Sequence, residues 1–167
     1  MTSLRLRVGA GAELLGDLHY VRDEYSFDFQ PSDGDVLARR CPAGTTSLLV
    51  QNLQLEVGLP EQSLMFAWGL HPQTIWSESR LEPPAARPGV VEVVWPDDLS
   101  LGTSVAVDDR FAWGTTWDPV RRWLRIAPSS VDDGTAVEIA TGVIVVVSGD
   151  QLRSVWLNPA IVDTRAS

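Results

Sequence analysis

The sequence has no lysine, one cysteine and two histidines among its 167 residues. With Cys41 as the only thiol, an intramolecular disulfide is excluded. Secreted domains of this kind usually carry paired cysteines, so we expect a reducing, cytoplasmic location. Residues 1–8 interrupt leucines with arginines, which is not the pattern of a signal-peptide apolar segment.

Long apolar runs are also missing. The longest aliphatic run, Val143 to Val147, is far too short to cross a bilayer. Hydrophobic residues make up 44% and charged residues 21% of the chain, which is typical of a globular domain. We expect one β domain over residues 1–162 and a frayed tail over 163–167.

Positive charge is scarce. The 22 acidic and 13 basic side chains give a net charge of -9, and all the basic ones are arginines. Such a field repels phosphate backbones and anionic lipid surfaces, so we expect neither a nucleic-acid nor a membrane partner. It favours a basic protein partner. The candidate contacts are aspartate pairs in predicted turns: Asp97, Asp98, Asp108, Asp109, Asp132 and Asp133.

No apolar pattern with helical spacing persists for the length of a typical helix, because 11 prolines and 13 glycines interrupt the chain. Apolar residues instead alternate with polar ones, most clearly over 53–57 and 64–70. This predicts an all-β, mostly antiparallel fold, a β-sandwich or small β-barrel of about nine to eleven short strands. We expect at most one or two short helices, and residues 13–19 are a candidate.

Three hairpin regions follow from the same alternation: 53–70, 111–126 and 143–157. Val143 to Val147 is apolar on both faces, which predicts a central strand. Residues 71–88 interrupt this pattern with four prolines and predict a long ordered loop. Such loops inside a compact domain often carry function.

Catalytic motifs are absent as well. The sequence has no Gly-x-Ser-x-Gly and no glycine-rich phosphate loop. Spacing alone leaves open a dyad of Cys41 with His19 or His71, but an incidental, half-buried thiol is the favoured interpretation. Carboxylates in predicted strands leave acid–base chemistry open, although a solvated outer face is favoured for them: Asp28, Glu56, Glu92 and Glu138.

Metal-binding patterns are equally scarce, with no His-x-His, Cys-x-x-Cys or His-Glu-x-x-His. Asp17 and His19 are two residues apart, which on a strand would point both side chains the same way. Scattered acids around one histidine occur by chance in an acidic protein. We therefore predict no metal and no cofactor.

Tryptophan is what the sequence has in excess, with seven residues against two tyrosines and four phenylalanines. Trp113 and Trp117 are predicted to share a strand face with Phe111. Such a group either fills a core, which we favour, or lines a site for a flat apolar ligand or a sugar ring. The candidate ligand-binding residues are Trp68, Trp76, Trp113, Trp117, Trp123 and His71.

Three functions remain open. The first is a non-catalytic acidic binding protein, of inhibitor or immunity type, with a basic protein partner. The alternative is a β-barrel that binds a small apolar or aromatic molecule in a tryptophan-lined pocket, either as a binding protein or as a cyclase- or isomerase-type enzyme. The third is an accessory subunit of a larger assembly. The distinction depends on whether the tryptophans fill the core or line a pocket.

Overall fold

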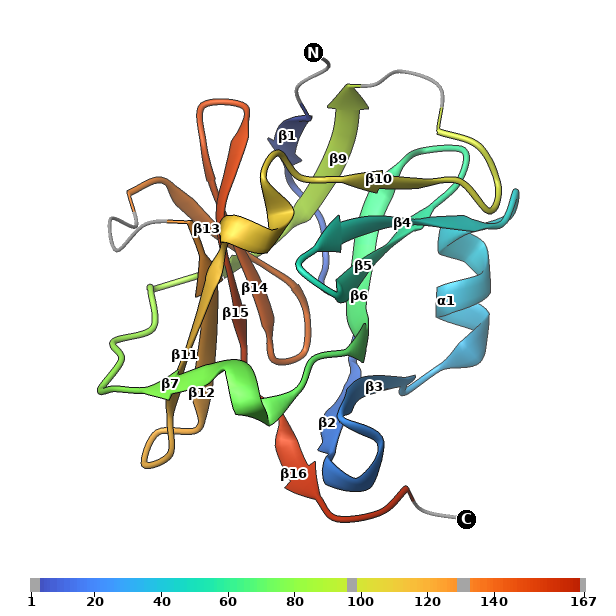
Figure 1. Cartoon of the computed structure of the whole chain (residues 1–167). Coiled ribbons are helices and arrows are strands. Elements are labelled where there is room, and N and C mark those ends of the chain that lie inside the picture. The colour runs from blue at the N-terminus through green and yellow to red at the C-terminus, as the bar shows by residue number, and fades with distance from the viewer. Residues whose placement is uncertain (1–3, 96–98, 129–132, 166–167) are drawn as a thin grey trace.

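The computed structural model describes residues 4–95, 99–128 and 133–165 (Figure 1). Within these residues the chain forms sixteen β-strands, one short α-helix and three 3-10 turns. The strands form two mostly antiparallel sheets that pack face to face as a sandwich. The predicted all-β, antiparallel class is confirmed. The strand count exceeds the expectation because several short edge strands carry no alternation of their own.

The first sheet has nine strands, and β6 is its centre. Seven of them follow the order β10 (Ser104–Ala106), β4 (Thr45–Val50), β5 (Leu53–Gly58), β6 (Ser63–Leu70), β3 (Ser26–Pro31), β2 (Gly16–Val21) and β16 (Ala160–Val162). The other two, β1 (Arg5–Gly9) and β9 (Val90–Trp95), form an antiparallel pair. This pair joins the beginning of β6, where Ser63 lies opposite Glu92.

The second sheet has seven strands. Their order is β7 (Trp76–Glu78), β11 (Gly114–Asp118), β12 (Trp123–Ala127), β15 (Gln151–Leu157), β14 (Val143–Ser148), β13 (Thr135–Ala140) and β8 (Arg87–Pro88). The two edge strands, β7 and β8, are short and run parallel to their neighbours. The inner strands are all antiparallel, and β14 and β15 form the hairpin that the sequence predicts for 143–157.

Strand β14 shows why its sequence lacks alternation. Val143, Val145 and Val147 face the main core between the sheets. Ile144 and Val146 face the other side, where they belong to a second apolar cluster. The predicted central strand is therefore confirmed, and both of its faces are covered.

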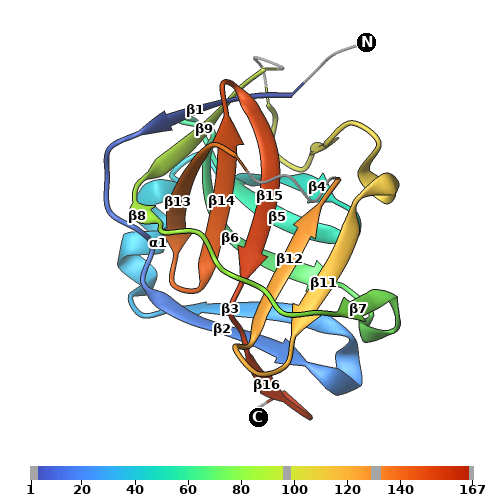
Figure 2. The ribbon, with the colours of Figure 1, turned by 90° about the vertical axis from the view of Figure 1, so that its left-hand side faces the viewer.

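The second cluster is covered by the chain segment between β7 and β8, which we call the strap (residues 79–86). Figure 2 shows it crossing the outer face of the second sheet from one edge to the other. Leu81 of the strap packs with Ile144, Val146 and Trp156. The predicted loop over 71–88 is thus an ordered cover that also supplies both edge strands of the sheet.

Two local expectations are wrong. Residues 13–19 do not form a helix, because Leu14 pairs with Ala140 and β2 begins at Gly16. The apolar residues of β2 alternate, with Leu18 and Tyr20 buried between the sheets. Phe111 does not share a strand face with Trp113, since it lies in a 3-10 turn over Arg110–Ala112 with 69% of its surface exposed.

The single described α-helix, α1 (Gly34–Arg40), forms in a region where the sequence shows no helical pattern. Asp33 caps its first turn by accepting a hydrogen bond from the Asp35 amide at 2.9 Å. Two arginines in its last turn interact favourably with the negative end of the helix dipole. Seven residues are too few to show a helical period in the sequence.

Candidate functional site

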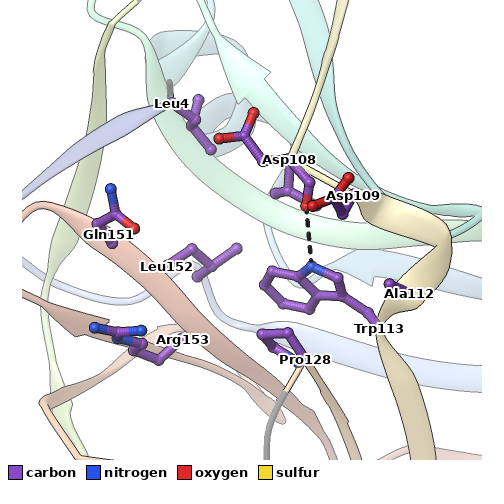
Figure 3. Close-up of a pocket in the computed structure, with 10 residues that line it drawn as sticks. Leu4, Asp108, Asp109, Ala112, Trp113, Pro128, Gln151, Leu152 and Arg153 are labelled. Carbon is purple, nitrogen blue, oxygen red and sulfur yellow. Dashed lines mark hydrogen bonds between the residues drawn. The ribbon is translucent and has the colours of Figure 1, made fainter. Parts of the chain in front are cut away.

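A cavity of about 250 Å³ opens at the end of the sandwich where β1 begins and β12 ends. Segments distant in sequence form its walls, and Figure 3 shows how their side chains surround it. The described residues that line it are Leu4, Val107, Asp108, Asp109, Ala112, Trp113, Pro128, Gln151, Leu152 and Arg153.

The floor of this cavity is apolar. The exposed fraction is 6% for Trp113 and 8% for Leu152, and both belong to the main core. The indole Nε1–H of Trp113 donates to the carbonyl oxygen of Asp108 at 3.4 Å (Figure 3). This contact ties the floor to the rim, and it orients the indole from a residue only five positions earlier.

The rim carries opposite charges on opposite sides. Asp108 and Asp109 lie on one side and Gln151 and Arg153 on the other (Figure 3). Both aspartates are exposed, and neither forms an ion pair with another described residue. A turn holds them in place, since the Asp109 carbonyl accepts from the Ala112 amide at 2.8 Å. Unpartnered carboxylates above an indole suit a cation.

His71 lies elsewhere, in a fully buried polar network between the two sheets. Its Nε2 is 2.6 Å from the Oε1 of Gln51, which also accepts from the Thr115 hydroxyl at 3.0 Å. Its Nδ1 accepts from the Nε1–H of Trp76 at 2.8 Å. The Gln51 amide donates to the Trp113 carbonyl. Burial lowers the pKa of His71 to about 4, so the ring is neutral at pH 7.

The candidate tryptophans do not form one site. Trp76 packs against Trp117 with ring centroids 5.4 Å apart, beside His71 in the core. Trp68 lies on the outer face of the first sheet, where its indole donates to Glu56 at 3.3 Å. Trp123 packs against Trp156 beneath the strap. Trp113 alone of the candidates lines the cavity in Figure 3.

The candidate aspartates are separated as well. Asp97, Asp98 and Asp132 lie outside the described residues, and Asp133 is an exposed residue just before β13. Asp108 and Asp109 are therefore the described aspartate pair that lines the same cavity as a candidate tryptophan, Trp113. Sequence reasoning placed them in different sets from Trp113, and it missed the opposite wall formed by Gln151 and Arg153.

Other chemistry considered from the sequence has structural partners. The Cys41 thiol donates to the Leu37 carbonyl at 3.3 Å, at the end of α1. The Glu56 carboxylate accepts from Ser47 at 2.8 Å, and Glu92 pairs with Arg7. Burial, and then the charge of Glu13, raise the pKa of Glu138. Within the described ranges, no three His, Cys, Asp or Glu side chains are grouped to hold a metal ion.

In the part of the chain that the structure describes, no helix combines the length and apolarity that a membrane span requires. Comparisons with known proteins find no match: no protein-family model fits the chain, and no curated protein or solved structure is significantly similar to it.

Proposed function

We propose that this chain is a non-catalytic binding protein and that the cavity above Trp113 binds a basic side chain of a protein partner. The observation that carries the proposal is the position of Asp108 and Asp109 above Trp113. A cation inserted there meets two carboxylates at the rim and an indole at the floor. Cation–π contacts of this kind contribute about 0.5–2 kcal/mol.

The charge of the whole chain supports the same partner. A net charge of -9 attracts a basic surface at long range and accelerates the encounter. Gln151 and Arg153, across the cavity, have donors that suit main-chain carbonyl groups of the same partner. The lone Cys41 agrees with a cytoplasmic location, which is part of the proposal.

A protein partner is favoured over a small molecule by Phe111, which lies next to the cavity residue Ala112. The ring is 69% exposed, and the guanidinium of Arg110 lies 4.4 Å from its centroid. Exposed aromatic and arginine side chains are the residue types that anchor protein interfaces. None of the described cavity residues is serine, cysteine or histidine, which supports binding rather than nucleophilic catalysis.

The test uses two probe tripeptides, acetyl-Gly-Arg-Gly-amide and acetyl-Gly-Glu-Gly-amide. NMR follows the indole N–H of Trp113, assigned with Trp113→Phe. We expect a saturable shift with the arginine peptide and none with the glutamate peptide. Asp108→Asn with Asp109→Asn should weaken binding at least about tenfold, which corresponds to 1.4 kcal/mol.

The matched control is Asp35→Asn with Asp133→Asn, which removes the same charge from exposed positions outside the cavity. Its affinity for the arginine peptide should stay within about twofold of wild type, as for surface charges at a distance. An equal loss in both double variants would mean that only net charge matters. That result, or an unchanged Trp113 signal with the arginine peptide, would overturn the proposal.

A further inference from the structure

A second cavity, of about 330 Å³, lies on the outer side of β2, β3 and β16, at the lower end of the molecule in Figure 1. It contains His19, which the sequence singled out beside Asp17. The described residues that line it are His19, Val21, Asp28, Gln30, Val162, Thr164 and Arg165. Its size is within the range of small-molecule sites.

The strand register brings an imidazole and a carboxylate together here. His19 of β2 lies directly opposite Asp28 of β3, so both side chains are on the same face of the sheet. On the other side of β2, Ala160 of β16 is the parallel partner of His19. A small alanine at that position leaves space beside the imidazole. The Asp28 carboxylate is oriented by Gln30, whose amide donates to Oδ2 at 3.1 Å.

The chain itself places a cation in the wall of this cavity. Arg165, which follows β16, returns to the sheet and binds two carboxylates. Its Nε and Nη2 donate to the Glu24 carboxylate at 3.0 and 3.1 Å. Its Nη1 lies 3.1 Å from the Asp28 Oδ2. Hydrogen bonds to Glu24 and then to Asp28 raise the pKa of Arg165 above its ordinary value.

These contacts show which ligand geometry the carboxylates accept. Two donors of one guanidinium face Glu24 while a third faces Asp28, an arrangement that a planar fork satisfies and a single ammonium does not. With Arg165 in place, the two carboxylates still leave one negative charge. Asp17, two residues before His19 on the same strand, adds another.

Two other polar side chains of the cavity have no hydrogen-bond partner among the described residues. Neither ring nitrogen of His19 and no hydroxyl of Thr164 forms a hydrogen bond with a described residue. Val21 and Val162 supply apolar wall beside them. The two valines can contact the methylene groups of a ligand the size of an amino acid. The side chains of His19 and Thr164 can form hydrogen bonds with its other polar groups.

We propose that this cavity binds a small guanidinium compound and that Arg165 occupies the guanidinium position until such a ligand displaces it. Arg165 then acts as a tethered competitor. Its segment is also held by the ion pair of Arg22 with Asp163 at 3.3 Å, which keeps it close to the site. The inference concerns a different cavity from the proposed partner site and does not depend on it.

The experiment uses agmatine as the probe and the ring protons of the two histidines as the readout. His19 lies in the cavity, while the fully buried His71 serves as an internal reference. In Arg165→Ala we expect a saturable shift of His19 with agmatine and no shift of His71. Wild type should bind agmatine at least about tenfold more weakly, because a tethered group competes at an effective concentration in the millimolar range.

Two further variants and one neutral probe make the result decisive. Adding Asp28→Asn to Arg165→Ala should abolish most of the shift, because one of the two carboxylates is lost. Arg7→Ala, which removes an exposed arginine paired with Glu92 elsewhere, should behave as wild type. Butylurea, a neutral planar analogue, should not bind to Arg165→Ala.

The proposal is overturned if agmatine leaves His19 of Arg165→Ala unchanged, or if butylurea binds as well as agmatine. It is also overturned if Asp28→Asn has no effect in that background. Near-ultraviolet circular dichroism that matches wild type shows that each variant is folded. Arg165 and Asp28 lie on the surface side of the sheet, so these substitutions do not open the core.

Discussion

The indole of Trp76 donates its Nε1–H to Nδ1 of His71 at 2.8 Å, and this contact determines the tautomer of the buried ring. Since Nδ1 accepts, the proton must lie on Nε2, where it is donated to Gln51 at 2.6 Å. His71 follows β6 of the first sheet and Trp76 begins β7 of the second. The pair is therefore a polar connection between the sheets that works only with a neutral imidazole.

A neutral buried imidazole makes stability depend on pH. The pKa of His71 is about 4 in the folded protein, against 6.5 for an ordinary histidine. Between these values the unfolded chain binds a proton that the folded chain does not, so stability falls as the pH drops from about 6.5 to 4. A shift of this size corresponds to about 3 kcal/mol. Urea unfolding at pH 7.5, 6, 5 and 4 measures it.

The variant that checks this assignment is His71→Gln, which should lose most of that slope although it is less stable at every pH. A slope that survives in His71→Gln would show that other groups cause it.

Gln51 joins three buried partners, so replacing it should be costly. Gln51→Met removes the Oε1 that accepts from His71 and Thr115 and the amide that donates to the Trp113 carbonyl, which leaves His71 and Thr115 only their 3.3 Å contact with each other. We expect a loss of about 2–4 kcal/mol in the free energy of unfolding, measured by denaturant titration. Gln54→Met, on the half-buried outer face of β5, is the control and should stay within about 1 kcal/mol of wild type.

Asp118 anchors the strap. Its carboxylate accepts hydrogen bonds from the amides of Leu81, Val120 and Arg121 at 2.9, 2.9 and 3.1 Å. These bonds lower the pKa of Asp118, and the bond from the Leu81 amide has the largest effect. In Asp118→Ala we expect faster hydrogen exchange at the Leu81 amide and in β7 and β8. Asp133→Ala should leave these rates unchanged.

Because that pKa is lowered, the stabilisation from Asp118 is complete above the ordinary carboxyl value of 3.8 and is lost only as the pH falls below it. The difference in Leu81 protection between wild type and Asp118→Ala should therefore persist to pH 4. A difference that disappears between pH 7 and 5 would contradict the anchor.

Two glycines offer a matched pair. A Cβ on Gly16 would lie 2.6 Å from the Phe29 ring and closer still to the Gln30 carbonyl oxygen. A Cβ on Gly34, at the start of α1, meets nothing within 4 Å. Gly16→Ala should destabilise by about 2 kcal/mol or more through overpacking. Gly34→Ala should be neutral or stabilising by up to about 1 kcal/mol, and thermal unfolding distinguishes the two.

Much of the fold could be predicted where local pattern and burial agree. The alternation in β5 and β6 indicates strands with one buried face, and the unbroken apolar run of β14 indicates a strand buried on both faces. Strands β7 and β8 could not be predicted, since they are two or three residues long and exist only through parallel neighbours. Pro88 of β8 is tolerated there because an edge strand needs fewer amide donors.

The two cavities and the buried His71 network could not be predicted from the sequence, because they depend on contacts between residues far apart in the chain. Trp113 and Asp108 were both candidates, but nothing in the sequence places Gln151 across from them. His71 was a candidate for ligand binding because it lies near Trp76 in the proline-rich segment. Its burial depends on Gln51 and Thr115, which lie 20 and 44 residues away and have no distinguishing pattern.

The strap also has a consequence for the order in which the chain folds. Strands β7 and β8 flank it, and their partners β11 and β13 both come later in the sequence. During synthesis the strap therefore emerges before the sheet that it covers exists. It can dock only after β11 to β15 have assembled, and until then Trp156 and Val146 face water on the growing sheet.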